Sequence, residues 1–173
     1  MIDYIQNTFA DLKAKKDIWW YLSKQDINSQ FRRSKVGSLW LVVNQLCFAF
    51  GAGLIWAAVF GLDPIEFIPF IATGFAVWGF VASCFVEGSS ALVVSQGYIK
   101  QVNMPITVYI MRSVSSNVIR LAIGLAVAVM VVFTFGGMKL VNPVYILPGL
   151  VLLLVTGFFV SVFCGLVGAK YRD

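Results

Sequence analysis

A single carboxylate stands out because it ends a long apolar stretch near the middle of the chain. The run EGSSALVVSQGYIKQVNMP covers residues 87–105 and begins with Glu87, whereas residues 67–86 before it hold no charge. A charge that faces lipid costs about 2.5 to 3.5 kcal/mol on insertion scales, so we expect Glu87 to face a polar cavity or a bundle interior. On a helix its face also carries Ala76, Gly79, Ser83 and Ser90. Glu87 and Ser90 are therefore candidates for a transport path, although a structural hydrogen bond or a place at the inner mouth fits Glu87 equally well.

Apart from Glu87, the apolar stretches hold no Asp, Glu or His side chain that could carry catalysis. The sequence contains no histidine, the commonest general base and metal ligand. Its cysteines, Cys47, Cys84 and Cys164, lie in apolar stretches, where cysteine behaves as a small hydrophobic residue. No G-x-x-x-x-G-K-[ST] sequence occurs, so the chain has no P-loop for nucleotide phosphates. We expect no enzyme activity, no metal site and no cofactor in this chain.

The composition is that of an integral membrane protein. Of the 173 residues, 60% are hydrophobic and 12% are charged, against about 25% charged residues in soluble domains. The apolar stretches that are long enough for membrane-spanning helices cover residues 36–62, 67–94, 114–137 and 144–169. The sequence predicts an all-α integral membrane protein, with a cytoplasmic interfacial segment over residues 1–35 and a transmembrane domain over residues 36–173.

The positive charges predict how these spans are oriented. Of the 13 Lys and Arg residues, seven precede Val36, three lie within residues 95–120, and two follow the last span. Only Lys139 lies in the opposite set of loops, and Lys and Arg are in excess on the cytoplasmic side of membrane proteins. We therefore expect both termini and the loop over residues 95–120 in the cytoplasm. The basic residues form no stripe that would indicate binding of nucleic acid.

The first 35 residues are expected to include an amphipathic helix that lies on the inner leaflet. Over residues 2–16, apolar side chains recur at helical spacing and charged side chains take the other side. Trp19 and Trp20 follow in the run IWWYL, and their rings suit the headgroup region of a bilayer. The alternative is a solvated basic tail, which the two tryptophans disfavour.

Small residues in the last span predict that another helix packs closely against it. Gly157, Ser161, Gly165 and Ala169 recur every four residues and so share one face. The helix that packs there belongs either to the same subunit or to another one.

The polar stretch that follows Glu87 ends at Pro105, which has no backbone N–H and disfavours helix at the two residues before it. A break at this point would leave a short cytoplasmic element over residues 106–111, ahead of Arg112. Such an element is either a connecting turn or a short helix that a soluble partner can grip.

Three stretches of the chain resemble a known family. FRRSKVGSLW (residues 31–40), EGSSALVVSQGYIKQVNMP (87–105) and GLVGAKYRD (165–173) resemble the membrane permease of bacterial ATP-binding-cassette exporters for O-antigen and capsule polysaccharides. The resemblance follows the whole chain in order and spacing, and the middle stretch is the most specific. Those permeases have six spans, so the chain resembles their N-terminal two-thirds, with four of the six spans.

The resemblance implies partners and a substrate. It implies a homodimeric permease in the bacterial inner membrane that works with a cytoplasmic ATP-binding-cassette ATPase subunit. Its substrate would be a polysaccharide attached to a polyprenyl diphosphate lipid. The loop that contacts the ATPase in the family maps onto residues 97–112. The candidate coupling residues are Gly97, Tyr98, Ile99, Lys100, Gln101, Met104 and Pro105.

Basic and aromatic residues ahead of the first span are candidates for contact with the lipid diphosphate and with inner-leaflet lipids. They are Trp19, Trp20, Arg32, Arg33 and Lys35. Guanidinium and ammonium groups suit phosphate oxygens. Their alternative role is to hold the first span in its orientation.

Other functions fit the same features. A small tetraspan scaffold or assembly protein needs only the packing face and the interfacial helix. A permease for teichoic acid or for a drug has the same architecture, because none of these residues reads the identity of a sugar. Binding of an ATPase through residues 97–112 separates a permease from a scaffold, whereas a lipid-modifying enzyme would need a cluster of acidic or histidine side chains.

Overall fold

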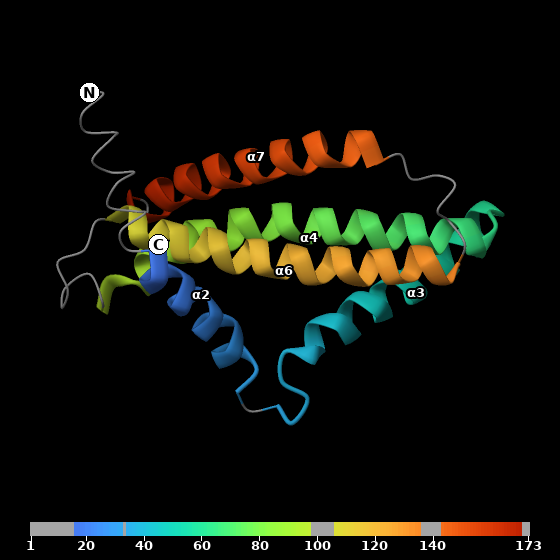
Figure 1. The fold of residues 1–173 in the computed structure, drawn as a ribbon, viewed down its shortest axis with the longest axis horizontal. Coiled ribbons are helices and arrows are strands. Elements are labelled where there is room, and N and C mark those ends of the chain that lie inside the picture. The colour runs from blue at the N-terminus through green and yellow to red at the C-terminus, as the bar shows by residue number, and fades with distance from the viewer. Residues whose placement is uncertain (1–15, 33, 98–105, 136–142, 171–173) are drawn as a thin grey trace.

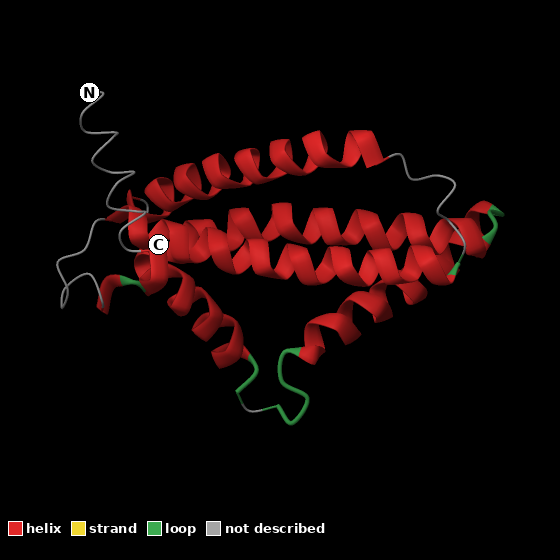
Figure 2. Ribbon diagram, viewed as in Figure 1, coloured by secondary structure: helices red, strands yellow, loops and turns green. Residues whose placement is uncertain are grey.

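The computed structural model describes residues 16–32, 34–97, 106–135 and 143–170, and no strand occurs among them (Figure 2). Its helices are α2 (Lys16–Gln30), α3 (Leu39–Phe60), α4 (Pro64–Val94), α6 (Ile106–Thr134) and α7 (Pro143–Lys170). The predicted amphipathic segment over residues 2–16 lies outside the described residues except for Lys16. The predicted boundary between residues 35 and 36 falls in the turn between α2 and α3.

Four of these helices are long and apolar enough to cross a membrane. The segments that qualify are Leu39–Phe60, Pro64–Val94, Thr107–Thr134 and Ile146–Lys170. Large apolar side chains lie exposed on their outer faces, among them Trp56, Phe70, Trp78 and Phe159. An apolar surface of this extent suits contact with lipid. Among the described residues, the all-helical fold and the four helices long and apolar enough to cross a membrane are therefore confirmed.

The third of these helices starts earlier than the sequence indicated. Residues 106–111, which we expected as a separate short element, are the first turns of the 29-residue helix α6. Proline is favoured at the start of a helix because its missing N–H needs no partner there. The proline at position 105 is thus compatible with a helix that begins directly after it, and Arg112 belongs to that helix.

A tight turn reverses the chain between α3 and α4. Gly61 ends α3 with a φ of +65°, a left-handed conformation that glycine adopts without a steric penalty. Asp63 then caps α4, because its side chain accepts a hydrogen bond from the N–H of Ile65 at 2.9 Å. Pro64 occupies the first turn of α4. Because the turn is so short, α3 and α4 are antiparallel neighbours.

α4 lies at the centre of the bundle and packs against α3, α6 and α7 (Figure 1). α2 packs against α6, and α2 and α3 form a V beside the other helices (Figure 1). Along the bundle the buried apolar residues form three clusters, centred on Ile68, Phe80 and Leu92. The end of α4, the start of α6 and the end of α7 lie together at one end of the bundle, near α2 (Figure 1).

Small residues bring the backbones of α4 and α7 into contact. A Cβ atom added to Gly88 would lie 2.9 Å from the Cα of Ser161, and one added to Gly157 would lie 2.6 Å from the ring of Phe80. A Cβ added to Gly165 would lie 3.3 Å from the carbonyl oxygen of Gly88. The predicted small-residue face of the last span therefore packs, at these positions, against α4 of the same chain.

Candidate functional site

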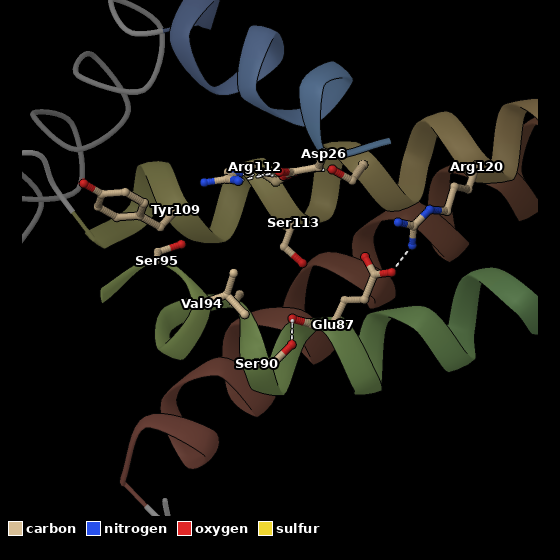
Figure 3. Close-up of a pocket in the computed structure, with 11 residues that line it drawn as sticks. Asp26, Glu87, Ser90, Val94, Ser95, Tyr109, Arg112, Ser113 and Arg120 are labelled. Carbon is tan, nitrogen blue, oxygen red and sulfur yellow. Dashed lines mark hydrogen bonds and ion pairs between the residues drawn. The ribbon is translucent and has the colours of Figure 1, made fainter. Parts of the chain in front are cut away.

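A cavity of about 170 Å³ whose lining includes several charged and hydroxyl side chains lies between α2, α4 and α6, at the end of the bundle where α4 ends and α6 begins (Figure 3). Its walls carry two carboxylates, two arginines, four serines and a tyrosine. The residues that line it are Asp26, Glu87, Ser90, Ala91, Val94, Ser95, Tyr109, Arg112, Ser113, Ser116 and Arg120. This is the candidate functional site, and it contains both predicted transport-path residues, Glu87 and Ser90.

The first ion pair joins α2 to α6. Arg112 donates from Nε to Oδ2 of Asp26 at 2.6 Å and from Nη2 to Oδ1. One edge of the guanidinium therefore binds the carboxylate through two parallel hydrogen bonds. The Arg112 side chain is 12% exposed, and bidentate pairing of this kind is the strongest form of the interaction. Fully buried Ser23 strengthens the same junction, because its hydroxyl donates to the carbonyl oxygen of Arg112 at 3.0 Å.

The second ion pair joins α4 to α6. Arg120 donates from Nη1 to Oε1 of Glu87, as Figure 3 shows. The same Nη1 lies 3.5 Å from Oδ1 of Asn117, and Nη2 donates to Oε1 of Gln30, the last residue of α2, at 3.2 Å. Glu87 therefore faces the interior of the bundle, and its partner is an arginine two helical turns beyond Arg112.

Several donors in the cavity wall are buried without a hydrogen-bond partner. Within the described ranges these include the hydroxyls of Tyr109 and Ser113 and the Nε–H of Arg120. Tyr109 is only 2% exposed, so its hydroxyl has little access to bulk solvent. A buried donor without an acceptor costs about 1 to 3 kcal/mol. The cavity is thus suited to a group that brings acceptor oxygens, such as water or an oxyanion.

The depth of the cavity follows from the length of α4. Glu87 lies about 35 Å along the helix from Pro64, whereas the hydrocarbon core of a bilayer is about 30 Å thick. If Pro64 marks one membrane surface, Glu87 reaches the headgroup level of the other. At that depth charged side chains in pairs cost far less than at the membrane centre.

A second cavity, of about 140 Å³, lies between α3, α4 and α6. Most of its wall is apolar or small, and the polar residues in it are Asn44, Gln45, Ser83 and Arg120. Arg120 also lines the first cavity, so the two cavities share this side chain. Gln45 is held in place because its Nε2 donates to the carbonyl oxygen of Ala72 at 2.9 Å.

The predicted lipid-contact residues lie outside the cavity. Trp19 is half-buried, whereas Trp20 is 39% exposed and lies beneath Nζ of Lys24, which is 5.2 Å from its ring centre. Arg32 and Lys35 are exposed in the turn between α2 and α3, and Arg33 lies outside the described residues. Trp20, Arg32 and Lys35 therefore lie on the surface of α2 and its following turn and do not line the cavity.

Of the predicted coupling residues, the structure describes Gly97, which is exposed just beyond the end of α4. The others, Tyr98, Ile99, Lys100, Gln101, Met104 and Pro105, lie outside the described residues. In the predicted packing face, Ala169 is exposed. The neighbouring Gly168 lies against α4, since a Cβ added there would collide with the carbonyl oxygen of Ser89.

Sequence reasoning assigned Arg112 and Arg120 only to the orientation of the spans and missed Asp26. A signal was present: Arg112, Ser116 and Arg120 recur every four residues, which places them on one side of a helix. An intramembrane arginine on such a face indicates a functional site, with an acidic partner expected on a neighbouring helix. The partners themselves are 86 and 33 residues away in sequence, beyond the reach of a local pattern.

The part of the chain that the structure describes contains no group of three or more His, Cys, Asp or Glu side chains placed to hold a metal ion.

Comparisons with models of protein families, with curated proteins and with solved structures found no match to this chain.

Proposed function

We propose that this chain is the permease subunit of an ATP-driven exporter that moves a lipid-linked polysaccharide, similar to O-antigen, across the bacterial inner membrane. In this proposal two copies of the chain work with cytoplasmic ATP-binding-cassette ATPase subunits. Both termini and the loop between α4 and α6 are in the cytoplasm. The proposal joins the resemblance of residues 31–40, 87–105 and 165–173 to the arrangement of charges in the bundle.

The observation that carries the proposal is the position of the two arginines on α6. The range that the resemblance assigns to ATPase contact, residues 97–112, includes the first two turns of this helix, which begins at Ile106. Arg112 and Arg120 lie in its first four turns, and each is paired with a carboxylate on a different neighbouring helix. A displacement of that range along the axis of α6 would therefore act first on the two ion pairs. This is the connection that an exporter driven by a separate ATPase needs.

Purification of the chain from its host membrane tests the proposal. We expect the tagged chain, extracted in mild detergent, to retain an ATPase subunit in native mass spectrometry. Lys100→Glu should release that subunit, because it reverses a charge in the predicted contact loop. Lys139→Glu is the matched control, since Lys139 lies in the loop predicted to face outward.

Purification without any ATPase, under conditions that preserve other transporter complexes, would contradict the proposal and favour a scaffold. Retention of the ATPase by both variants would contradict the assignment of the contact loop. The carried polymer is identified separately, by loss of surface polysaccharide in a host that lacks this chain.

A further inference from the structure

The two arginines of the cavity differ in one respect. In Arg112, the edge formed by Nε and Nη2 grips both oxygens of Asp26. In Arg120, the corresponding edge holds no carboxylate: Nε is buried without a partner among the described residues, and Nη2 holds only the neutral amide oxygen of Gln30 at 3.2 Å. Glu87 uses the other side of the guanidinium, through Nη1.

We infer that the Nε and Nη2 edge of Arg120 is a binding site for the phosphate group of a lipid. In the same cavity, the corresponding edge of Arg112 donates hydrogen bonds to both oxygens of one anion, the Asp26 carboxylate. A guanidinium edge fits phosphate as it fits carboxylate, with two parallel charge-assisted bonds. Gln30 is the exposed last residue of α2, so its amide can yield to the stronger acceptor.

The surroundings of Arg120 suit a ligand with a charged head and an apolar chain. Arg120 forms one wall of the cavity between α3, α4 and α6, whose other walls include Leu41, Phe75 and Ile123. Beyond Gln30, the turn after α2 forms a further open cavity lined by Gln30, Phe31, Ser34 and Trp40. Apolar and aromatic residues thus line two cavities that include Arg120 and its partner Gln30.

The charges around the site are compatible with an added anion. Asp26 and Glu87 are each matched by an arginine, so neither carboxylate is left with an uncompensated charge. Arg32 and Lys35 lie exposed in the turn that follows Gln30 and add positive charge on that side. The buried hydroxyls of Tyr109 and Ser113 are further donors in the neighbouring cavity.

The site rests on the geometry of Arg120 alone, and only the identification of its lipid as cargo rests on the proposed function. Two sources have the same chemistry: a glycerophospholipid of the bilayer and a polyprenyl phosphate. Each has a matched compound without the phosphate, namely diacylglycerol and polyprenol. Titration of the purified chain with these four lipids, followed by native mass spectrometry, measures the contribution of the phosphate in each pair.

We expect the phosphate-bearing member of at least one pair to bind about tenfold or more tightly than its partner, as for a charge-assisted hydrogen-bonded contact. The preferred pair identifies the source. Arg120→Lys, which keeps the positive charge beside Glu87 but removes the edge, should lose most of this preference. Glu87→Gln should strengthen binding severalfold, since it removes the anion that competes for the guanidinium.

Equal binding of both members in both pairs overturns the inference, and so does an Arg120→Lys variant with the affinity of the unmodified chain. Should Arg120→Lys fail to fold, the double variant Arg120→Gln/Glu87→Gln removes both charges together and gives the same test. The titration uses no ATPase. A failure here therefore leaves the proposed function standing, and loss of the ATPase in the earlier experiment leaves this site standing.

Discussion

Arg112 and Arg120 lie about 12 Å apart along the axis of α6 and bind carboxylates on two different helices, Asp26 of α2 and Glu87 of α4. α6 is therefore tied on two sides within a short length at one end of the bundle. The pairs lie at the level where the membrane meets the cytoplasm in the proposed orientation. Each pair can be broken without the other, which makes their roles separable by substitution.

The Glu87 and Arg120 pair should show strong coupling in a double-mutant cycle. Glu87→Gln and Arg120→Gln each leave one charged group without its partner, so each should lower stability by about 1 to 3 kcal/mol. The double variant should recover about 1 to 2 kcal/mol of that loss. Thermal unfolding in detergent measures all four proteins. Additive losses would show that the two groups do not interact in the folded chain.

Asp26 should be needed to keep α2 on α6. Asp26→Asn removes the charge that Arg112 grips, so α2 should open more often, with amide hydrogen exchange about tenfold faster over residues 16–30. Asp17→Asn is the matched control, because Asp17 is exposed on the same helix. Equal exchange in the two variants would mean that the ion pair does not hold the helix.

Gly88 should tolerate no side chain. Gly88→Ala places a Cβ 2.9 Å from the backbone of Ser161, so α4 and α7 must separate, at a cost of about 1 to 3 kcal/mol. Gly74→Ala on the same helix meets nothing within 4 Å and should be neutral or stabilising by up to about 1 kcal/mol. The apparent melting temperatures of the two variants in detergent compare them, and a similar fall in both would refute the close contact.

The cap of α4 should depend on the oxygen of Asp63. Asp63→Ala removes the acceptor for the N–H of Ile65 and should cost about 1 kcal/mol. Asp63→Asn keeps an acceptor oxygen and should retain most of the stability. Thermal unfolding of both variants checks this, and an equal loss would assign the effect to the charge instead of the hydrogen bond.

The predicted orientation places Lys100 and Lys139 on opposite sides of the membrane. In a variant without native cysteines, Lys139→Cys should react with a membrane-impermeant thiol reagent added to spheroplasts. Lys100→Cys should react only after the membrane is opened. The reverse pattern would invert the orientation and move the cavity to the outer surface.

The number of spans could be predicted because each span corresponds to one continuous apolar stretch of the sequence. Such a stretch is recognised without knowledge of contacts elsewhere in the chain. The spacing of Gly157, Ser161 and Gly165 also predicted most of the face of α7 that packs against another helix. Beyond Gly165 the contact with α4 continues at Gly168, whereas Ala169 is exposed, because the crossing of two helices decides whether the contact advances by three or four residues. The crossing angle depends on both helices, so it cannot be predicted from the sequence of one of them.

The candidate site was predictable in part. Glu87 was expected to face the interior because an isolated charge beside an apolar stretch must avoid lipid. Its partner could not be assigned, since Arg120 and Arg112 were equally available on the following helix. The role of α2 was missed because its sequence, KDIWWYLSKQDINSQ, mixes polar and apolar residues, and only Ser23 and Ile27 become buried.

The glycine contacts between α4 and α7 have a mechanical consequence. Backbones that touch over several turns cannot slide past one another without a collision, so these two helices behave as one stiff body. On its α2 side, by contrast, α6 is held through Arg112 and Ser23, and an arginine side chain has several rotatable bonds that can absorb a shift. Shear within the bundle is therefore expected along the face between α2 and α6, while α4 and α7 provide the fixed frame.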